Sequence, residues 1–368
     1  MKIFCMSFGS TSTKIGAFDG EKELFIRSYD LGKGVYPAKF ANLDEHQAFA
    51  IGLFSGVLAE YGLVYQDFDA FVGRGGAVAY IKGGVYRVNE IMIADTYRNG
   101  HDAHPAKLGP RVAYALGQAF DKDAFIVNPP SVDEFIEIAR ATGLKEVIRR
   151  SNSHALNQKE VALRYAADTG RDYHDMNLIV CHLGGGISIT AHRKGEMIDS
   201  NDIIEGDGPM TPTRSGMVPA IPLIGLCYSG KYTYDEMMHK CIKTGGLYAH
   251  LGTDDVREIQ RRIREGDAYA ETILNAMVYQ IAKFAGSMAV ALRGKVDAIL
   301  LTGGMAHSDM ICGQLEDYLG FLGAPLVRYP GEFEIQGLAN GVRRVLSGID
   351  PILEYDGKDV WQGFEGAD

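Results

Sequence analysis

The sequence predicts an α/β protein made of two similar halves, each with a mixed sheet flanked by helices. Short apolar segments typical of strands alternate with longer segments of helical periodicity. Several strands end in glycine-rich loops, as in α/β proteins that bind ligands at the carboxyl ends of their strands. A unit of strand, glycine loop and return strand occurs twice, about half a chain apart, which indicates an internal duplication.

The first half of the chain begins with a strand–loop–strand unit. The predicted strands are 2–6, 15–18, 23–29, 69–72 and 124–127, and the predicted helices are 46–61 and 106–120. The polar loop between the first two strands is rich in Gly, Ser and Thr, so these strands are expected to pair as a hairpin.

The second half repeats this pattern. The predicted strands are 178–181, 187–192 and 296–301, and the predicted helices are 154–169, 268–292 and 335–347. Helix 268–292 carries an apolar face, which either packs in the protein's own core or serves self-association. The tail 349–368 is rich in acidic residues, and we expect it to be solvated and partly disordered.

Composition excludes several classes of protein. The 368 residues are 46% hydrophobic and 23% charged, which is enough for two globular domains. A net charge of −10 without a basic stripe argues against nucleic-acid binding. No stretch approaches the roughly 18 apolar residues of a transmembrane helix, and the first residues do not resemble a signal peptide. The five cysteines are widely spaced and form no CxxC pair, which favours free thiols in a reducing cytoplasm.

Glycine is the unusual residue, with 45 in the chain. We expect the excess at turns or where the backbone approaches a ligand. Two hairpin loops fit an anion, because their backbone N–H groups can converge on it. The first loop carries Ser10, Ser12 and Lys14, and the second carries His182 followed by Gly184, Gly185 and Gly186. An ordinary polar or glycine hairpin is the alternative for each.

Further candidates are two arginines and a histidine in loops or at a helix start, and a pair of glycines after a strand. Arg74 lies among glycines, Arg214 follows a Gly/Pro/Thr-rich segment, and His154 opens a helix. Arginine binds phosphate or carboxylate in bidentate fashion, although single arginines are more often surface residues. Gly303 and Gly304 follow strand 296–301, where they could face a nucleotide. His101 and His104 have no visible partner ligands for a metal.

These motifs resemble butyrate kinase, a branch of the acetokinase family, in order and spacing over nearly the whole chain. The matching motifs are Gly9–Ile15, Val72–Gly76, His154–Lys159, His182–Ser188, Arg214–Gly216, Tyr228–Thr233, Leu251–Asp255, Leu301–Gly304 and Tyr329–Glu332. The resemblance implies a duplicated actin-like ATPase fold, related to ribonuclease H, and magnesium-dependent transfer of phosphate from ATP to a short carboxylate. It implies that His154 and Arg214 contact the transferring phosphoryl group, and that Arg74 holds this phosphate or the substrate carboxylate. The two hairpin loops are expected to hold ATP phosphates, and Gly303 and Gly304 the adenosine.

The sequence departs from the family pattern where the magnesium site is expected. The family usually opens Asn-Pro-Gly-Ser, whereas this chain has Ser7-Phe8-Gly9-Ser10. Asn128 stands where an aspartate is usual, and we align Gln336 with a usual glutamate, although Glu332 and Glu334 are close by. Asp133 remains as a carboxylate. Neutral amides bind Mg²⁺ weakly, so the chain is either a carboxylate kinase with a shifted metal site or a catalytically weak paralogue that binds a nucleotide or a partner.

The duplication predicts two lobes. The first is expected to span 1–150 with the C-terminal segment 338–368, and the second 151–337 with the nucleotide-binding elements. The resemblance implies a cytoplasmic homodimer or higher oligomer that acts on small molecules, and it gives no reason to expect a nucleic-acid or membrane partner.

Overall fold

The computed structural model describes residues 1–9, 12–76, 78–98 and 105–365. The chain divides into two compact units. Unit 1 comprises Met1–Asp133, Ala155–Glu160 and Phe333–Asp368, and unit 2 comprises Glu134–His154 and Val161–Glu332. The predicted lobes divided instead at 150/151 and 337/338, so the observed units exchange short segments near both borders.

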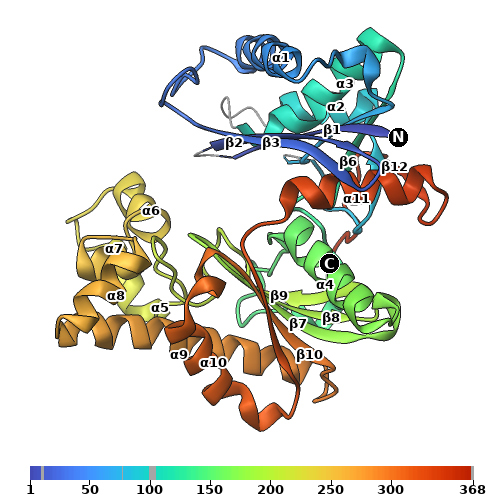
Figure 1. The fold of residues 1–368 in the computed structure, drawn as a ribbon. Coiled ribbons are helices and arrows are strands. Elements are labelled where there is room, and N and C mark those ends of the chain that lie inside the picture. Colours follow the sequence, from blue (N-terminus) through green and yellow to red (C-terminus); the bar gives the residue numbers. More distant parts are fainter. Residues whose placement is uncertain (10–11, 77, 99–104, 366–368) are drawn as a thin grey trace. The chain divides into compact units, whose positions relative to one another are not determined.

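Unit 1 is built on a seven-stranded mixed sheet of order β12-β5-β6-β4-β1-β2-β3 (Figure 1). Its strands are β1 (Lys2–Phe8), β2 (Ser12–Asp19), β3 (Lys22–Asp30), β4 (Ala70–Gly73), β5 (Val85–Arg87), β6 (Asp123–Val127) and β12 (Ile352–Glu354). The first three strands are antiparallel, whereas β4 runs parallel to β1 and β6 runs parallel to β4. This mixed sheet matches the predicted fold class.

Both faces of this sheet are covered by helices. The helices are α1 (Leu43–Glu60), α2 (Glu90–Arg98), α3 (Leu108–Phe120) and α11 (Glu334–Leu346). Phe4 and Met6 of β1 pack in a core with α1 and α3, whereas Ile3 and Cys5 pack in a second core with α11. The apolar run at the start of the chain is continuous because alternate side chains of β1 face two different cores.

Unit 2 is built on a five-stranded sheet of order β11-β10-β7-β8-β9. Its strands are β7 (Asn177–Leu183), β8 (Ile187–Arg193), β9 (Glu196–Ser200), β10 (Ala298–Gly303) and β11 (Leu326–Pro330). Strands β7 to β9 are antiparallel, and β10 and β11 add in parallel to β7. The order β3-β2-β1-β4-β6 of unit 1 therefore recurs as β9-β8-β7-β10-β11, which confirms the predicted duplication.

The helices of unit 2 are α4, which starts in unit 1, and six more that follow β9. Their bounds are α4 (Ala155–Thr169), α5 (Ala220–Cys227), α6 (Tyr234–Ile242), α7 (Gly246–Leu251), α8 (Val256–Arg264), α9 (Ala268–Ala291) and α10 (Asp309–Leu319). Sequence analysis predicted α4 and α9 but no element between 193 and 267, where β9 and α5 to α8 lie.

Helix α9 is long and apolar enough to cross a membrane by length and composition. The expectation that no segment approaches the length and hydrophobicity of a transmembrane helix was therefore wrong. This test is weak evidence, because the core helix of a globular protein passes it too. Its apolar face, including Val278, Ile281 and Ala285, packs in the core of unit 2. The alternative of burial in the protein's own core therefore holds for this face.

The expectation of a disordered tail was wrong for residues 352–355. Strand β12 pairs in parallel with β5, and Tyr355 is buried with its hydroxyl donating to the Asp95 carboxylate (2.6 Å). The acidic residues of the tail flank one short strand, which composition alone did not reveal.

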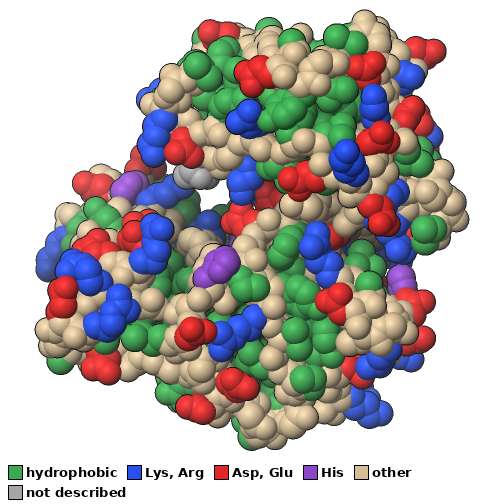
Figure 2. All heavy atoms as spheres, viewed as in Figure 1, with side chains coloured by type: hydrophobic (Ala, Val, Ile, Leu, Met, Phe, Trp, Pro, Cys, Tyr) green, Lys and Arg blue, Asp and Glu red, His purple; other side chains and the backbone are tan. Residues whose placement is uncertain are grey.

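On the face drawn in Figure 2, Lys and Arg side chains are interspersed with acidic and hydrophobic ones.

Candidate active site

In unit 2, three polar side chains meet where β7 turns into β8. The antiparallel register sets His182 directly opposite Ser188, and both are buried. His154 precedes the first residue of α4, and its ring stacks on His182 with centroids 3.9 Å apart and planes at 14°. His154 Nδ1 lies 2.9 Å from Ser188 Oγ. The structure therefore brings the predicted His154 and His182 together and adds Ser188.

The glycine loop between these strands packs against the predicted Arg214. A Cβ on Gly186 would lie 2.3 Å from Arg214 Nη1, so any other residue here would displace the arginine side chain. Thr211 Oγ1 donates to the Gly185 carbonyl (2.9 Å) and accepts the backbone N–H of Arg214 (3.0 Å). One threonine hydroxyl thus joins the glycine loop to the arginine loop.

Arg214 is a partly buried cation with unused hydrogen-bond donors. Among the described residues, its Nε and Nη1 are buried and have no hydrogen-bond partner. Burial lowers the pKa of the guanidinium, and the nearby Asp202 carboxylate opposes that shift. Because buried donors on a cation are costly when unsatisfied, this arrangement fits a group that an anionic ligand completes.

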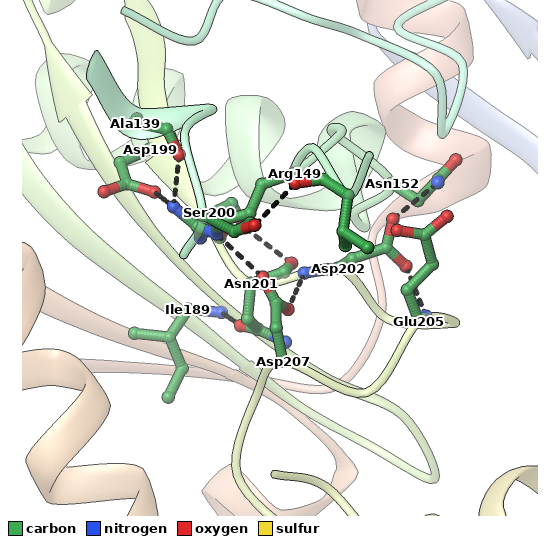
Figure 3. Close-up of polar contacts among 12 residues, drawn as sticks. Ala139, Arg149, Asn152, Ile189, Asp199, Ser200, Asn201, Asp202, Glu205 and Asp207 are labelled. Carbon is green, nitrogen blue, oxygen red and sulfur yellow. Dashed lines mark hydrogen bonds and ion pairs between the residues drawn. The ribbon is translucent and has the colours of Figure 1, made fainter. Parts of the chain in front are cut away.

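A second arginine organises the loop that follows β9 (Figure 3). Arg149 pairs with the carboxylates of Asp199 and Asp207, each at 2.9 Å, and donates to two backbone carbonyl oxygens. Burial opposes its charge, but the two carboxylates together raise the pKa of Arg149. Burial also raises the pKa of Asp199, against the opposing effect of Arg149.

The same network ties together the segments that carry His154 and Arg214. Asn152 donates to the Asp202 carboxylate (2.6 Å), and the Ile203 N–H donates to the Asn152 carbonyl (2.9 Å), as Figure 3 shows for the side-chain contact. Asn152 lies two residues before His154, and Asp202 begins the loop that leads to Arg214. These part-buried contacts therefore join the segment before His154 to the start of the loop that leads to Arg214.

Gly303 and Gly304 lie at the end of β10. Gly303 has a positive φ of +86°, and a Cβ there would come within 2.5 Å of the Leu183 carbonyl oxygen. Gly303 is thus required by backbone packing against β7. A Cβ on Gly304 or on Gly185 would meet no atom within 4 Å, so these two glycines leave open backbone that a ligand can approach.

In unit 1, Ser7, Arg74 and Glu334 form a polar cluster at the end of β1. Ser7 Oγ donates to Glu334 Oε2 (2.9 Å), and Arg74 Nη1 pairs with Glu334 Oε1 (3.1 Å). Glu334 is the first residue of α11, and the preceding Phe333 N–H donates to Asn157 Oδ1 (2.7 Å). Asn157 belongs to the His154–Lys159 motif, so this motif also fixes the start of α11.

The other residues predicted for the metal are Asn128, Asp133 and Gln336. Asn128 has a positive φ of +40°, and its side-chain oxygen accepts the Gly84 N–H (2.8 Å). Asp133 is buried, and its backbone N–H donates to the Ile81 carbonyl. Glu334 rather than Gln336 contacts Ser7 and Arg74. Within the described ranges, no group of three or more His, Cys, Asp or Glu side chains is arranged to hold a metal.

The structure describes both ends of the first hairpin loop, at Gly9 and Ser12. Ser12 begins β2, where its carbonyl accepts the Gly9 N–H (2.8 Å), and Lys14 lies opposite Ser7 in the register of β1 and β2. Ser10 lies outside the described residues, as do His101 and His104.

Sequence reasoning missed Ser188, Thr211 and the network around Arg149. Ser188 belongs to the motif that begins at His182, but it was not named as a site residue. The two residues lie at equal distances from the middle of the predicted hairpin loop, so a pairing of His182 with Ser188 could have been expected. Thr211 and Arg149 carried no such signal, because their partners are distant in sequence.

A model of the acetokinase family matches residues 119–326. Butyrate kinase 2 of Clostridium acetobutylicum is 42% identical over 354 residues, covering 96% of this chain and 99% of that protein. A probable butyrate kinase of Bacteroides thetaiotaomicron is 44% identical over 359 residues, covering 96% and 100%.

Solved structures agree on the fold. Porphyromonas gingivalis acetate kinase superposes with a TM-score of 0.76 at 18% identity, covering 93% of this chain and 98% of that one. A propionate kinase from Francisella tularensis gives 0.74 at 17% identity, covering 92% and 98%. These structures confirm the predicted actin-like ATPase fold, and the long, close matches to curated relatives confirm the resemblance read from the motifs: the chain belongs to the acetokinase family.

Proposed function

We propose that the protein is a carboxylate kinase that moves the γ-phosphate of ATP to a short-chain carboxylate, butyrate or a branched analogue, reversibly with the acyl phosphate. The observation that carries this proposal is Arg214, whose buried Nε and Nη1 have no hydrogen-bond partner among the residues that the structure describes. Its side chain packs against the glycine loop that follows His182. Relatives above 40% identity bear the name butyrate kinase. None of these observations favours the alternative of a catalytically weak paralogue.

The proposed chemistry needs positioning and charge more than acid–base catalysis. A carboxylate oxygen attacks the γ-phosphorus, the bond from phosphorus to the bridging oxygen of ATP breaks, and ADP leaves. A carboxylate is already a nucleophile, so no proton has to be removed. Negative charge spreads over the three equatorial oxygens of the transferring group, and fixed donors stabilise it.

The proposed roles follow from the type and burial of each side chain. Arg214 and His154 contact the phosphoryl group in transfer, and Arg74 holds that group or the substrate carboxylate. The loop residues His182, Gly184, Gly185 and Gly186 cradle ATP phosphates together with Ser10, Ser12 and Lys14. Gly304, with its open backbone, lies against the adenosine, and Gly303 shapes the turn that presents it.

The divalent metal of the reaction is proposed to be Mg²⁺, held by Glu334 and Ser7. Mg²⁺ is typically bound through one or two carboxylates, with water and substrate phosphates completing its shell. Glu334 and Ser7 supply one carboxylate and one hydroxyl oxygen within hydrogen-bonding distance of each other, so the donor set fits. When bound, the ion would neutralise charge on the phosphate oxygens. We keep Asn128, Asp133 and Gln336 as further candidates for the magnesium region.

We further propose a homo-oligomer in the cytoplasm. Helix α5 has no buried residue although most of its residues are apolar, and Ile221 is 80% exposed. Apolar patches of this kind mark interaction surfaces. The five cysteines are free, as expected in a reducing compartment.

The direct test is formation of acyl hydroxamate from ATP and Mg²⁺ with butyrate, isobutyrate or acetate. We expect turnover by the wild type and a loss of about a hundredfold or more in kcat for Arg214→Ala. Arg257→Ala is the matched control, because Arg257 is an exposed arginine paired only locally with Asp255. No acyl phosphate from any carboxylate at high enzyme concentration would overturn the proposal.

A further inference from the structure

The sheet of unit 2 holds His154 by two contacts from opposite strands. His182 on β7 and Ser188 on β8 face each other in register, and both reach His154. His182 supplies a flat ring surface at 3.9 Å, and Ser188 supplies an oxygen 2.9 Å from Nδ1. Both residues are buried, at 3% and 0% exposed, so their positions are set by the sheet.

The bond between Ser188 Oγ and His154 Nδ1 can run in either direction, because the tautomer of the imidazole decides which atom donates. The backbone N–H of His154 can only donate, and it approaches Ser188 Oγ at 3.4 Å. A hydroxyl carries one proton and two acceptor lone pairs. If one lone pair receives the amide, the hydroxyl proton can be directed to Nδ1. An imidazole that accepts at Nδ1 carries its proton on Nε2 when it is neutral.

We propose that Ser188 is a positioning residue that donates to Nδ1 of His154 and holds this ring as the neutral Nε2–H tautomer, with the stacked His182 fixing its plane. Nε2–H is then a hydrogen-bond donor toward the phosphoryl group without requiring protonation of the ring. This inference rests on the proposed carboxylate kinase function for its catalytic meaning, whereas the tautomer itself is a property of the protein alone.

The chemistry explains why a neutral donor suits this place. His182 lies parallel to His154 at ring-contact distance, and two imidazolium cations at that separation repel each other. Arg214 already supplies a full positive charge to the same loop. A histidine fixed as Nε2–H adds a directional donor without adding a further charge, so preorganisation is gained at little electrostatic cost.

The test combines a spectroscopic and a kinetic reading on the full chain. In ¹⁵N-histidine NMR at neutral pH, with His154 assigned from a His154→Gln spectrum, we expect an unprotonated Nδ1 and a protonated Nε2. Ser188→Ala should shift His154 toward a tautomer mixture and lower kcat roughly ten- to hundredfold, by analogy with loss of the hydrogen-bond partner of a metal-ligating histidine. KM should change little, because the loop that holds substrate remains.

Thr190→Val is the matched control. Thr190 is a buried hydroxyl on the same strand, and its Oγ1 bonds to Ser200 Oγ (2.8 Å), which keeps a second bond to the Asn201 carbonyl. This variant should leave both the His154 spectrum and kcat unchanged. Ser188→Cys, which retains a weak donor, should fall between wild type and Ser188→Ala and serves if the alanine variant does not fold.

Two results would overturn the inference: a proton on Nδ1 of His154 in the wild type, or a folded Ser188→Ala with wild-type kcat and spectrum. An inactive wild type would instead refute the proposed function. In that case the NMR reading alone still decides whether Ser188 fixes the tautomer.

Discussion

At the scale of single residues, the glycines have three different reasons to be glycine. A Cβ on Gly73 would lie 2.1 Å from the Gly109 carbonyl oxygen, and one on Gly109 would lie 1.9 Å from the Arg74 carbonyl oxygen. Strand β4 and helix α3 therefore touch backbone to backbone. Turns and ligand approach were the reasons expected from composition, and close packing between elements is the one that composition could not show.

Glu334 and Gln336 were both candidates for the metal from the sequence, and the structure separates them. Sequence alignment chose Gln336 as the counterpart of a metal-binding glutamate, but the structure sets the Glu334 carboxylate against Ser7 and Arg74. We therefore propose Glu334, two residues earlier and at the first turn of α11, as the carboxylate for the metal.

We predict that Glu334→Gln weakens the dependence of the kinase reaction on Mg²⁺ by about ten- to hundredfold in apparent affinity, because a neutral amide is a poorer ligand for a hard cation. The measurement is a Mg²⁺ titration of hydroxamate formation. Glu316→Gln, at an exposed glutamate of α10 in unit 2, is the control. The assignment fails if Glu334→Gln keeps the wild-type titration while Gln336→Glu tightens it.

At the scale of elements, the connection from β3 to α1 is closed by an aromatic cluster. Phe40 stacks on His46 with ring centroids 3.8 Å apart, and the Tyr36 hydroxyl lies 2.7 Å from His46 Nε2. His46 is 2% exposed. Burial lowers the pKa of His46 to about 4 from an ordinary value of 6.5, and burial raises the pKa of Tyr36 to about 12.

This lowered pKa predicts that unit 1 loses stability in acid. Between pH 6.5 and about 4 the unfolded chain binds a proton at His46 that the folded protein does not, so the free energy of unfolding falls as the pH falls through this window. A shift of this size corresponds to about 3 kcal/mol at most. Thermal unfolding followed from pH 4 to pH 7 measures the slope.

The double variant Tyr36→Phe/His46→Phe is the comparison, because it removes the titrating group and leaves no unpaired hydroxyl. Its stability should depend less on pH than that of the wild type between pH 4 and 6.5. An equal slope in both proteins would show that His46 does not contribute.

Helices and strands were predicted correctly where the apolar residues follow one clear periodicity. They were missed where only contacts with distant residues make the segment a helix or strand. Long or fully buried segments such as β1, β7, α4 and α9 were found within one or two residues, because their apolar patterns are set by the faces they bury. Strand β12 was missed because three residues in an acidic tail carry too little pattern; only pairing with β5 makes them a strand.

At the scale of the whole molecule, two units repeat one strand order. The repeat explains why both hairpin loops follow a first central strand, β1 in unit 1 and β7 in unit 2. The actin-like fold could be predicted from the motifs, since their order along the chain is a one-dimensional property. The exchange of short segments between units depends on long-range packing and was not predicted.

The exposed helix α5 predicts how copies of the chain associate. Ile221→Glu places a charge in the apolar surface and should lower the oligomer's mass toward that of the 40.2 kDa chain in light scattering after size exclusion. Ile349→Glu, at an exposed isoleucine of unit 1, should leave the mass unchanged. A wild type that is monomeric at high concentration would contradict the proposal.

The sequence by itself determined the α/β class, the duplication, the family resemblance and the identity of His154, His182 and Arg214 as candidate site residues, because periodicity and motif order are local properties of the chain. Only the tertiary structure decided that Ser188 and Thr211 join them, that Arg149 ties their segments together and that Glu334 stands with Arg74. These are contacts between residues tens to hundreds of positions apart, and the register of strands and the packing of loops, which no local pattern encodes, bring them within hydrogen-bonding distance.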